Sequence, residues 1–354
     1  MASRKICFSL IAILIVFTGC QQNLSIEKFS FDKIYYYAIQ EDVLKIVDSL
    51  NSIPDDSLSA TQKEIKQKYI ARFLSKSEKF DLQTQDSLII NTLTIFRNYW
   101  WDVLMKKHSI RKSEDKYGIL LSALIKSHSF AVDGKNVITA DAKDIPFQLS
   151  ILLRHHGYYS RVERTGNILD LIIWNNQTKE NYALTIGDTT VNVHVVFIDN
   201  TLTLGWEGYA TFDHFYPGGW TGADTLYCIK KDYNIESEHF KVSYLTHETQ
   251  HLLDKKLNPK VSGWMAEYRA KLAELSAANT TVYHLIDAFS KGSKDDSRLT
   301  HPYAEFRVIG DLSKEIFKEK FVTDTLKWNK IPYFEINKVS GKLLKQNSIR
   351  LKLK

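Results

Sequence analysis

One segment of the sequence places two histidines at a spacing that suits a shared metal ion. The segment reads Tyr244-Leu245-Thr246-His247-Glu248-Thr249-Gln250-His251-Leu252-Leu253-Asp254. Its apolar residues recur at helical spacing, and Ser237 is a plausible N-cap for a helix that contains it. On a helix, His247 and His251 stand at positions i and i+4, with roughly 5–6 Å between their Cβ atoms. Two imidazoles at this separation can bind one tetrahedral zinc ion.

Glu248 follows the first histidine and is not needed as a ligand. On the helix its carboxylate points beside the metal, toward a water in the open coordination position. We expect Glu248 to take a proton from that water and to pass it to a leaving amine, which is the chemistry of peptide-bond hydrolysis. The alternative is a buried helix whose two histidines only form hydrogen bonds.

A third ligand must come from another segment, and the residues from Trp264 to Leu275 predict a second helix that carries Glu267 and Glu274. The run Glu267-Tyr268-Arg269-Ala270 resembles the Glu-x-x-Ala pattern of the gluzincins, the zinc metallopeptidases in which a glutamate on a helix after the HExxH helix completes the site. This resemblance, which covers roughly residues 191–317, implies Glu267 as the third ligand and Glu274 as the reserve. The alternative for Glu267 is an exposed helix residue that pairs with Lys271.

The sequence departs from the gluzincin pattern at one position. Many members carry an aspartate four residues after the ligand glutamate, which orients the first histidine, but Lys271 stands there in this chain. The partner of that histidine is therefore open, and Asp254 is only a guess. The resemblance also implies a small sheet over the HExxH helix, with an antiparallel edge strand that binds the substrate backbone. The strand after Gly218-Gly219-Trp220 is the expected edge.

A peptidase also needs a donor for the oxyanion that develops on the scissile carbonyl. Gluzincins often use a tyrosine or histidine downstream of the ligand glutamate. His301 and Tyr303 are the candidates here, in the segment His301-Pro302-Tyr303. The alternative for His301 is a surface turn residue.

The N-terminus has the pattern of an exported chain. Arg4 and Lys5 precede the apolar stretch from Ile6 to Phe17, which is short for a membrane span. The quartet Phe17-Thr18-Gly19-Cys20 resembles the lipobox of bacterial lipoproteins, although Phe17 replaces the commoner leucine. This resemblance implies that Cys20 is lipidated, becomes the first residue of the mature chain and attaches it to a membrane of the cell envelope. The alternative is a plain signal peptide with an incidental cysteine.

The remaining patterns predict an α+β fold in four parts: a signal peptide over 1–19, a tether over 20–30, a helical region over 31–140 and a zincin-like α+β domain over 141–354. Helical periodicity marks 89–104 and 117–125, and Asp144-Ile145-Pro146 predicts a helix start. Residue types favour strands over 167–174, 182–186, 191–198, 204–212 and 224–229, with a turn or bulged loop at 216–220.

Composition and charge narrow the class of partner. The chain has 354 residues, and its 44% hydrophobic content allows one large core or two smaller ones. The formal net charge is +6, spread along the chain without an aromatic-basic motif, so we expect no nucleic-acid partner. Outside the leader and the lipid site only Cys228 remains, which excludes an intrachain disulfide in the mature protein.

Together these patterns predict a lipid-anchored envelope zinc metallopeptidase that acts on a peptide or protein substrate. The rival hypothesis is a non-catalytic envelope lipoprotein with a structural or vestigial zinc site, which binds a protein or glycan partner. The coordination sphere separates them, because a catalytic zinc keeps an open position and a structural zinc has four protein ligands.

The lipid anchor gives the first testable prediction. Cys20→Ser removes the thiol that would carry the lipid, so the variant is expected to stay full-length or to become soluble. Membrane fractionation and intact-mass measurement check this. Two results together would overturn the lipoprotein interpretation: the variant still fractionates with membranes, and intact mass shows that the chain is cleaved at a site other than Cys20.

Overall fold

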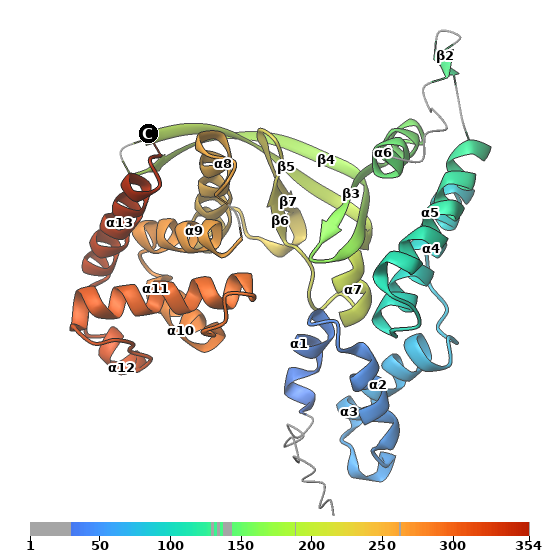
Figure 1. Ribbon diagram of the computed structural model, residues 1–354, viewed down its shortest axis with the longest axis horizontal. Coiled ribbons are helices and arrows are strands. Elements are labelled where there is room, and N and C mark those ends of the chain that lie inside the picture. Colours follow the sequence, from blue (N-terminus) through green and yellow to red (C-terminus); the bar gives the residue numbers. More distant parts are fainter. Residues whose placement is uncertain are drawn as a thin grey trace, which may run out of the picture.

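The computed structural model describes residues 30–128, 131–132, 135–136, 144–187, 189–261 and 263–353 (Figure 1). The chain has an α+β fold in which helices precede and follow one five-stranded sheet. The predicted fold class is therefore confirmed. The proposed signal peptide, Cys20, almost all of the tether and the predicted boundary at residue 140 lie outside the described residues.

Six α-helices lie in the described part of the N-terminal half. They are α1 (Ile34–Ile39), α2 (Val43–Ser52), α3 (Ala60–Tyr69), α4 (Ser87–Leu104), α5 (Ile110–Ser127) and α6 (Ile145–His155). The helical periods predicted over 89–104 and 117–125 correspond to α4 and α5. Asp86 caps the start of helix α4, where its carboxylate accepts the backbone N–H of Leu88 at 2.8 Å. The helix buries Ile89, Leu93 and Trp100.

The sheet has the strand order β3-β4-β5-β7-β6. A separate hairpin pairs β1 with β2, each of which is two residues long. The strands are β1 (Ala131–Val132), β2 (Lys135–Asn136), β3 (Tyr159–Thr165), β4 (Ile168–Ile186), β5 (Thr189–Leu204), β6 (Gly219–Thr221) and β7 (Thr225–Ile229). β5 and β7 are parallel and the other neighbours antiparallel, so the sheet is mixed. Figure 1 shows β4 and β5 as long bent ribbons that connect the two halves of the molecule.

Three predictions about strands were wrong. The segments 167–174 and 182–186 belong to one strand, β4, because the residues between them stay paired with β5. The segment 204–212 is not a strand but contains helix α7 (Gly205–Thr211). Gly205 has φ +87° and ends β5, and the Asp170 carboxylate accepts the N–H of Trp206 at 2.7 Å at the start of the helix. Third, the strand near 224–229, β7, lies inside the sheet, and the edge strand is β6, in a segment predicted to be a turn.

The C-terminal half is helical and follows the sheet. A π-helix over Phe240–Thr246 precedes α8 (His247–Leu257), α9 (Trp264–Ala277), α10 (Val282–Gly292), α11 (Thr300–Phe317), α12 (Thr325–Trp328) and α13 (Tyr333–Arg350). One face of the sheet packs on the π-helix and α8 through Val195, Phe197 and Leu226 against Tyr244 and Leu252. This contact fixes the direction of the HExxH helix relative to the sheet.

A buried ionic network holds α8, α9 and α13 together. The guanidinium of Arg269, only 2% exposed, donates to the Asp254 carboxylate at 2.8 Å and to the Asn347 side chain at 3.0 Å. Gln250 donates to the same aspartate at 2.7 Å. Because each charge is paired and hydrogen-bonded, these charges can be buried. Removal of one partner would leave the other as an unpaired buried charge and destabilise the fold.

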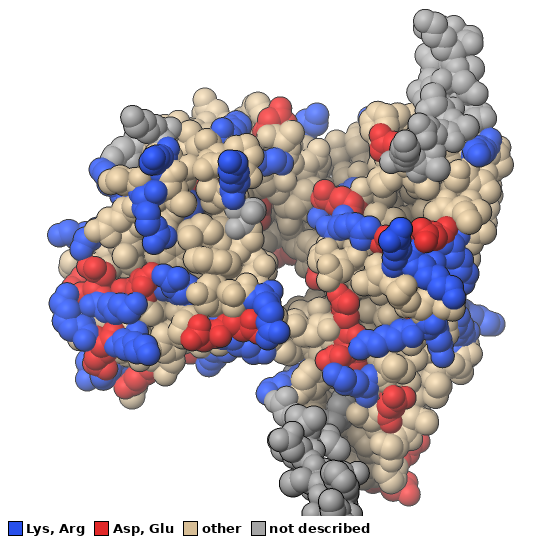
Figure 2. All heavy atoms as spheres, viewed as in Figure 1, with Lys and Arg blue, Asp and Glu red and all other residues tan. Residues whose placement is uncertain are grey.

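The surface drawn in Figure 2 shows basic and acidic side chains interspersed, with a deep recess between the two halves of the molecule. Among the described residues, no helix combines the length and apolar character that a bilayer span requires.

Helix α7 generates a prediction about pH. Burial, and then the nearby Asp170, raise the pKa of Glu207 to about 7. The folded state therefore holds this proton more tightly than the unfolded state, and stability is lost as pH rises from the ordinary glutamate pKa through about 7. Glu207→Gln removes this loss, and we expect a gain of at most about 3 kcal/mol at pH 8 and almost none at pH 4.

Denaturant unfolding of both proteins across this pH range measures the effect. Glu335→Gln, at an exposed position of α13, is the control and should leave the profile unchanged. A constant difference between wild type and Glu207→Gln at all pH values would contradict the assignment.

Candidate metal centre

The HExxH helix starts from the predicted N-cap. The Ser237 hydroxyl accepts the backbone N–H of Phe240 at 3.1 Å, and the chain continues through the π-helix into α8. Tyr244, Leu245 and Leu252 are buried against the sheet. The opposite side of the helix, which carries both histidines, therefore faces α9.

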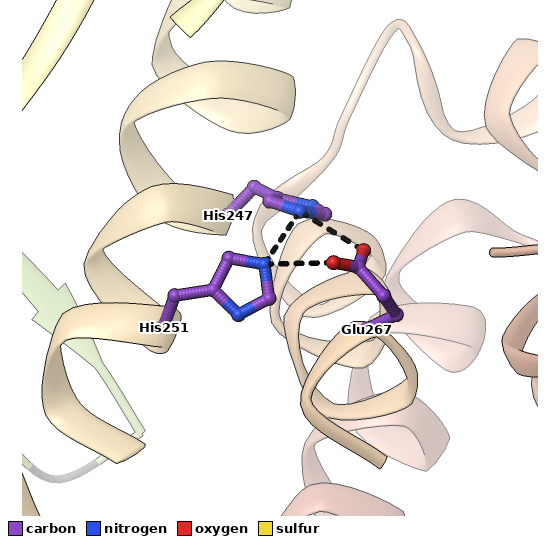
Figure 3. A group of neighbouring side chains, drawn as sticks. All are labelled: His247, His251 and Glu267. Atoms are coloured by element: carbon purple, nitrogen blue, oxygen red, sulfur yellow. Dashed lines mark hydrogen bonds and ion pairs between the residues drawn. The ribbon is translucent and has the colours of Figure 1, made fainter. Parts of the chain in front are cut away.

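Three side chains from α8 and α9 converge, and together they could hold a metal ion (Figure 3). The Nε2 atoms of His247 and His251 lie 3.0 Å apart. Oε2 of Glu267 lies 3.4 Å from Nε2 of His247, and Oε1 lies 3.3 Å from Nε2 of His251. These are the three residues that the sequence predicted as ligands, and Glu267 rather than Glu274 is the carboxylate in the group.

The donor atoms fit a bound cation. In a tetrahedral zinc site with bonds of about 2.0–2.2 Å, neighbouring ligand atoms are separated by roughly 3.3–3.5 Å, close to the separations here. Oε2 of Glu267 is buried and forms no hydrogen bond of good geometry, although nitrogens of His247 and His301 lie nearby. A cation between the three side chains would satisfy this buried oxygen.

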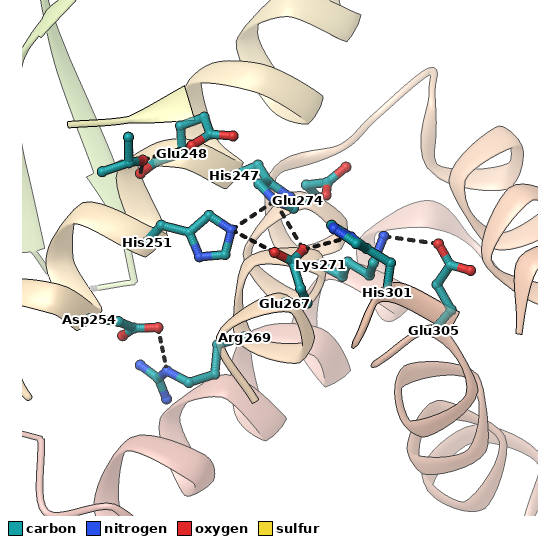
Figure 4. A network of polar contacts seen from close by, with 11 residues as sticks. His247, Glu248, His251, Asp254, Glu267, Arg269, Lys271, Glu274, His301 and Glu305 are labelled. Carbon is teal, nitrogen blue, oxygen red and sulfur yellow. Dashed lines mark hydrogen bonds and ion pairs between the residues drawn. The ribbon is translucent and has the colours of Figure 1, made fainter. Parts of the chain in front are cut away.

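Glu274 orients the first histidine. Its Oε1 lies 2.5 Å from Nδ1 of His247 (Figure 4). Glu274 lies on the same face of α9 as Glu267, two turns further along the helix. A proton on Nδ1, donated to this carboxylate, leaves Nε2 with its lone pair toward the ligand cluster. The guess that Asp254 fills this role was wrong, because Asp254 is buried against Arg269 and Gln250. Lys271, which stands where gluzincins carry an aspartate, pairs instead with Glu305 at 3.0 Å.

The cluster has a strong internal field. Burial opposes the charged form of His247, but Glu274 and then Glu267 outweigh it and raise its pKa to about 10. Burial alone would raise the pKa of Glu267, yet the nearby imidazoles of His247, His251 and His301 hold it well below its usual range. A binding cation has to displace a proton from His247, which makes its affinity weaker at low pH.

Glu248 lies beside the cluster and is held from the sheet. The Thr221 hydroxyl lies 2.7 Å from Oε2 of Glu248 and 3.0 Å from the Glu248 carbonyl oxygen, and donates its proton to one of them. Thr221 belongs to the edge strand β6, so the sheet positions the carboxylate. Sequence reasoning missed Thr221, because its segment was predicted to follow a turn and a lone threonine carries no motif.

The two predicted oxyanion donors are placed differently. Nδ1 of His301, in the first turn of α11, lies 3.1 Å from Oε2 of Glu267, and its side chain is 65% exposed. The ring of Tyr303 packs instead on Trp264, with 5.0 Å between ring centroids. The structure thus brings His301 to the cluster and gives Tyr303 a packing contact, while a catalytic role for either residue stays a prediction.

In comparisons with known proteins, no family model, no curated protein and no solved structure matches this chain. The gluzincin resemblance is therefore limited to the motif, its order along the chain and the convergence of the three side chains. The function has to be argued from the site itself.

The cluster predicts how metal content responds to substitution. Wild type is expected to bind about one ion per chain. Glu267→Ala removes a ligand and should abolish most of the binding. Glu274→Gln keeps the shape but weakens the hold on His247, and we expect a drop of about 10- to 100-fold in metal affinity.

Elemental analysis and chelator competition measure these changes, with Glu335→Ala on α13 as an exposed control. Full occupancy in Glu267→Ala together with loss in Glu274→Ala would transfer the ligand role to Glu274.

Proposed function

We propose that this chain is a zinc-dependent hydrolase of peptide bonds, attached to the cell envelope by a lipid on Cys20. The observation that carries the enzymatic part is the arrangement of Glu248: it lies beside a three-ligand cluster, outside the ligand set, with its carboxylate held by Thr221. Two histidines and one carboxylate form a ligand set found in catalytic zinc sites, which keep a further position open. The anchor is supported by the N-terminal sequence alone.

Each residue has a defined task in this scheme. His247, His251 and Glu267 would hold the ion, and Glu274 keeps His247 in the tautomer that can bind it. Zinc bound there would supply a Lewis acid that lowers the pKa of a water and polarises a carbonyl. Glu248 accepts the proton of the attacking water and delivers it to the nitrogen of the leaving amine. His301, exposed and next to Glu267, is the donor that we assign to the developing oxyanion.

Edge strand β6 gives this chemistry a place to bind a polypeptide. Gly222 N–H bonds the Thr225 carbonyl and Ile229 N–H bonds the Gly218 carbonyl, so Trp220, between them, also faces β7. The N–H and C=O groups of Gly219 and Thr221 then point to the open edge. A substrate strand can pair with them directly beside Glu248.

Gly219 is needed for this arrangement. A Cβ at this position would lie 2.4 Å from the ring of Tyr244 and 2.5 Å from the Tyr227 carbonyl oxygen. Neither neighbour can move away easily. Tyr244 is buried in the core between the sheet and the π-helix, and the Tyr227 oxygen belongs to the backbone of β7. Glycine therefore lets the edge strand approach the HExxH helix closely.

Glu248→Gln separates metal binding from catalysis. The substitution keeps the shape and the contact with Thr221 but removes the base, so the variant is expected to fold, to retain zinc and to lose about 10²–10⁴-fold in peptidase activity. His247→Ala should lose zinc as well as activity. A broad peptide library with mass-spectrometric detection is the assay, and Glu335→Gln is the control.

Two outcomes would count against the proposal. Equal activity of wild type and Glu248→Gln would overturn the assigned mechanism. Zinc binding without cleavage of any library peptide would favour the rival, a non-catalytic lipoprotein with a structural zinc.

A further inference from the structure

The face of the sheet that is turned away from α8 carries a groove of about 1020 Å³. The register defines its floor. Lys179 pairs with Val196, Val196 with Tyr227 and Tyr227 with Trp220, so these side chains form one row across four strands. The next row along, which contains Val195, Leu226 and Thr221, faces the HExxH helix instead.

The groove meets the metal centre at the edge strand. Thr221, on the edge strand, borders the groove, while its hydroxyl contacts Glu248 on the other face of the sheet. Lys255, one turn beyond His251 on α8, lines it too, with Nζ 3.3 Å from the carbonyl oxygen of Gly222. A chain that binds along the free edge of β6 therefore lies next to the base on one side and next to the groove on the other.

The charged side chains that line the groove are mostly positive. Four cationic side chains line it, and the single carboxylate, Glu163, is already paired with Arg161. Within the described part of the chain, the other three cations, Arg154, Lys179 and Lys255, have no carboxylate partner, since Arg154 lies over the Tyr159 ring and Lys255 donates to a backbone carbonyl. They are exposed and converge on one hollow, which concentrates a positive potential there.

We propose that this groove selects acidic peptide segments as substrates. This inference rests on the proposed function, and it names the substrate class of the same site. Side chains of a strand alternate between the two faces of a sheet. A peptide paired with Gly219 and Thr221 thus sends every second side chain to the face that carries Trp220, where Arg161 lies 5.0 Å from the indole centroid and Lys255 closes the end.

A polypeptide fits this place better than another polyanion. The free backbone groups of β6 match a peptide backbone, and the alternation puts one carboxylate in every two residues toward the cations. Arg154 and Lys179 lie farther from the edge and add long-range attraction, which is sensitive to salt.

The test uses Glu248→Gln, zinc-loaded, so that binding is measured without cleavage. Two fluorescent peptide pools are compared by anisotropy, one with Asp and Glu and the other with Asn and Gln at the same positions. We expect tighter binding of the acidic pool, weakening with salt, and a loss of about 2- to 5-fold for each of Lys255→Gln and Lys179→Gln. Lys256→Gln, the exposed neighbour on α8 that does not line the groove, is the matched control and should bind like the parent.

Cleavage by the wild type with native Glu248 separates the two proposals. Faster cleavage of the acidic pool, lowered by Lys255→Gln and not by Lys256→Gln, supports both. Cleavage of the two pools at equal rates, with equal binding, overturns the acidic selectivity and leaves the hydrolase in place. Acid-selective binding without any cleavage overturns the hydrolase and supports acidic-peptide recognition. Stronger binding of heparin than of the acidic peptides would overturn the peptide class.

Discussion

Helix α9 places two carboxylates, two turns apart, against the same histidine, and the site depends on this contact. Glu267 reaches Nε2 of His247 and Glu274 reaches Nδ1, so the imidazole is held at both nitrogens. The ring cannot rotate without breaking a contact to a mostly buried anion. His251 lies one turn further along α8, so its Nε2 meets the other oxygen of the same Glu267 carboxylate.

The charges on α9 also explain why the helix stays where it is. Arg269 and Lys271 are buried beside Glu274, and each cation is paired with a carboxylate from another helix, Asp254 on α8 and Glu305 on α11. These ion pairs form only at a defined distance and orientation of the two side chains, whereas apolar contacts are not directional. They hold α8, α9 and α11 in one register, and the three candidate metal ligands lie at the centre of that arrangement.

Local patterns were sufficient for the parts of the molecule that local chemistry decides. The helix with His247 and His251, the N-cap at Ser237 and the start of α6 follow from spacing and capping, and the structure has them. The place of Glu267 among the three candidate ligands could be predicted from the gluzincin resemblance and its order along the chain. Glu274 was recognised only as a possible ligand, since the choice between binding the metal and binding the histidine is made by the packing of two helices.

Tertiary contacts decided the parts that were predicted wrongly. The residues of α7 have strand-like types, but Gly205 and the Asp170 carboxylate start a helix there. Thr221 and the groove carry no sequence motif, because the groove residues come from strands and helices that meet only in the folded chain. The edge strand is three residues long, below what residue patterns resolve.

The π-helix before His247 influences the direction in which the HExxH motif faces. A π-helical turn contains more residues than an α-helical one, so a helix interrupted by it emerges rotated relative to a regular α-helix of the same residues. In an evolving lineage, loss of one residue between Phe240 and Thr246 would return this stretch to regular α-helical turns and leave the histidines pointing close to their present direction. Loss of one residue between His247 and His251 would instead turn His251 by roughly 100° away from α9. The segment before the motif therefore tolerates a change of length that the motif itself does not.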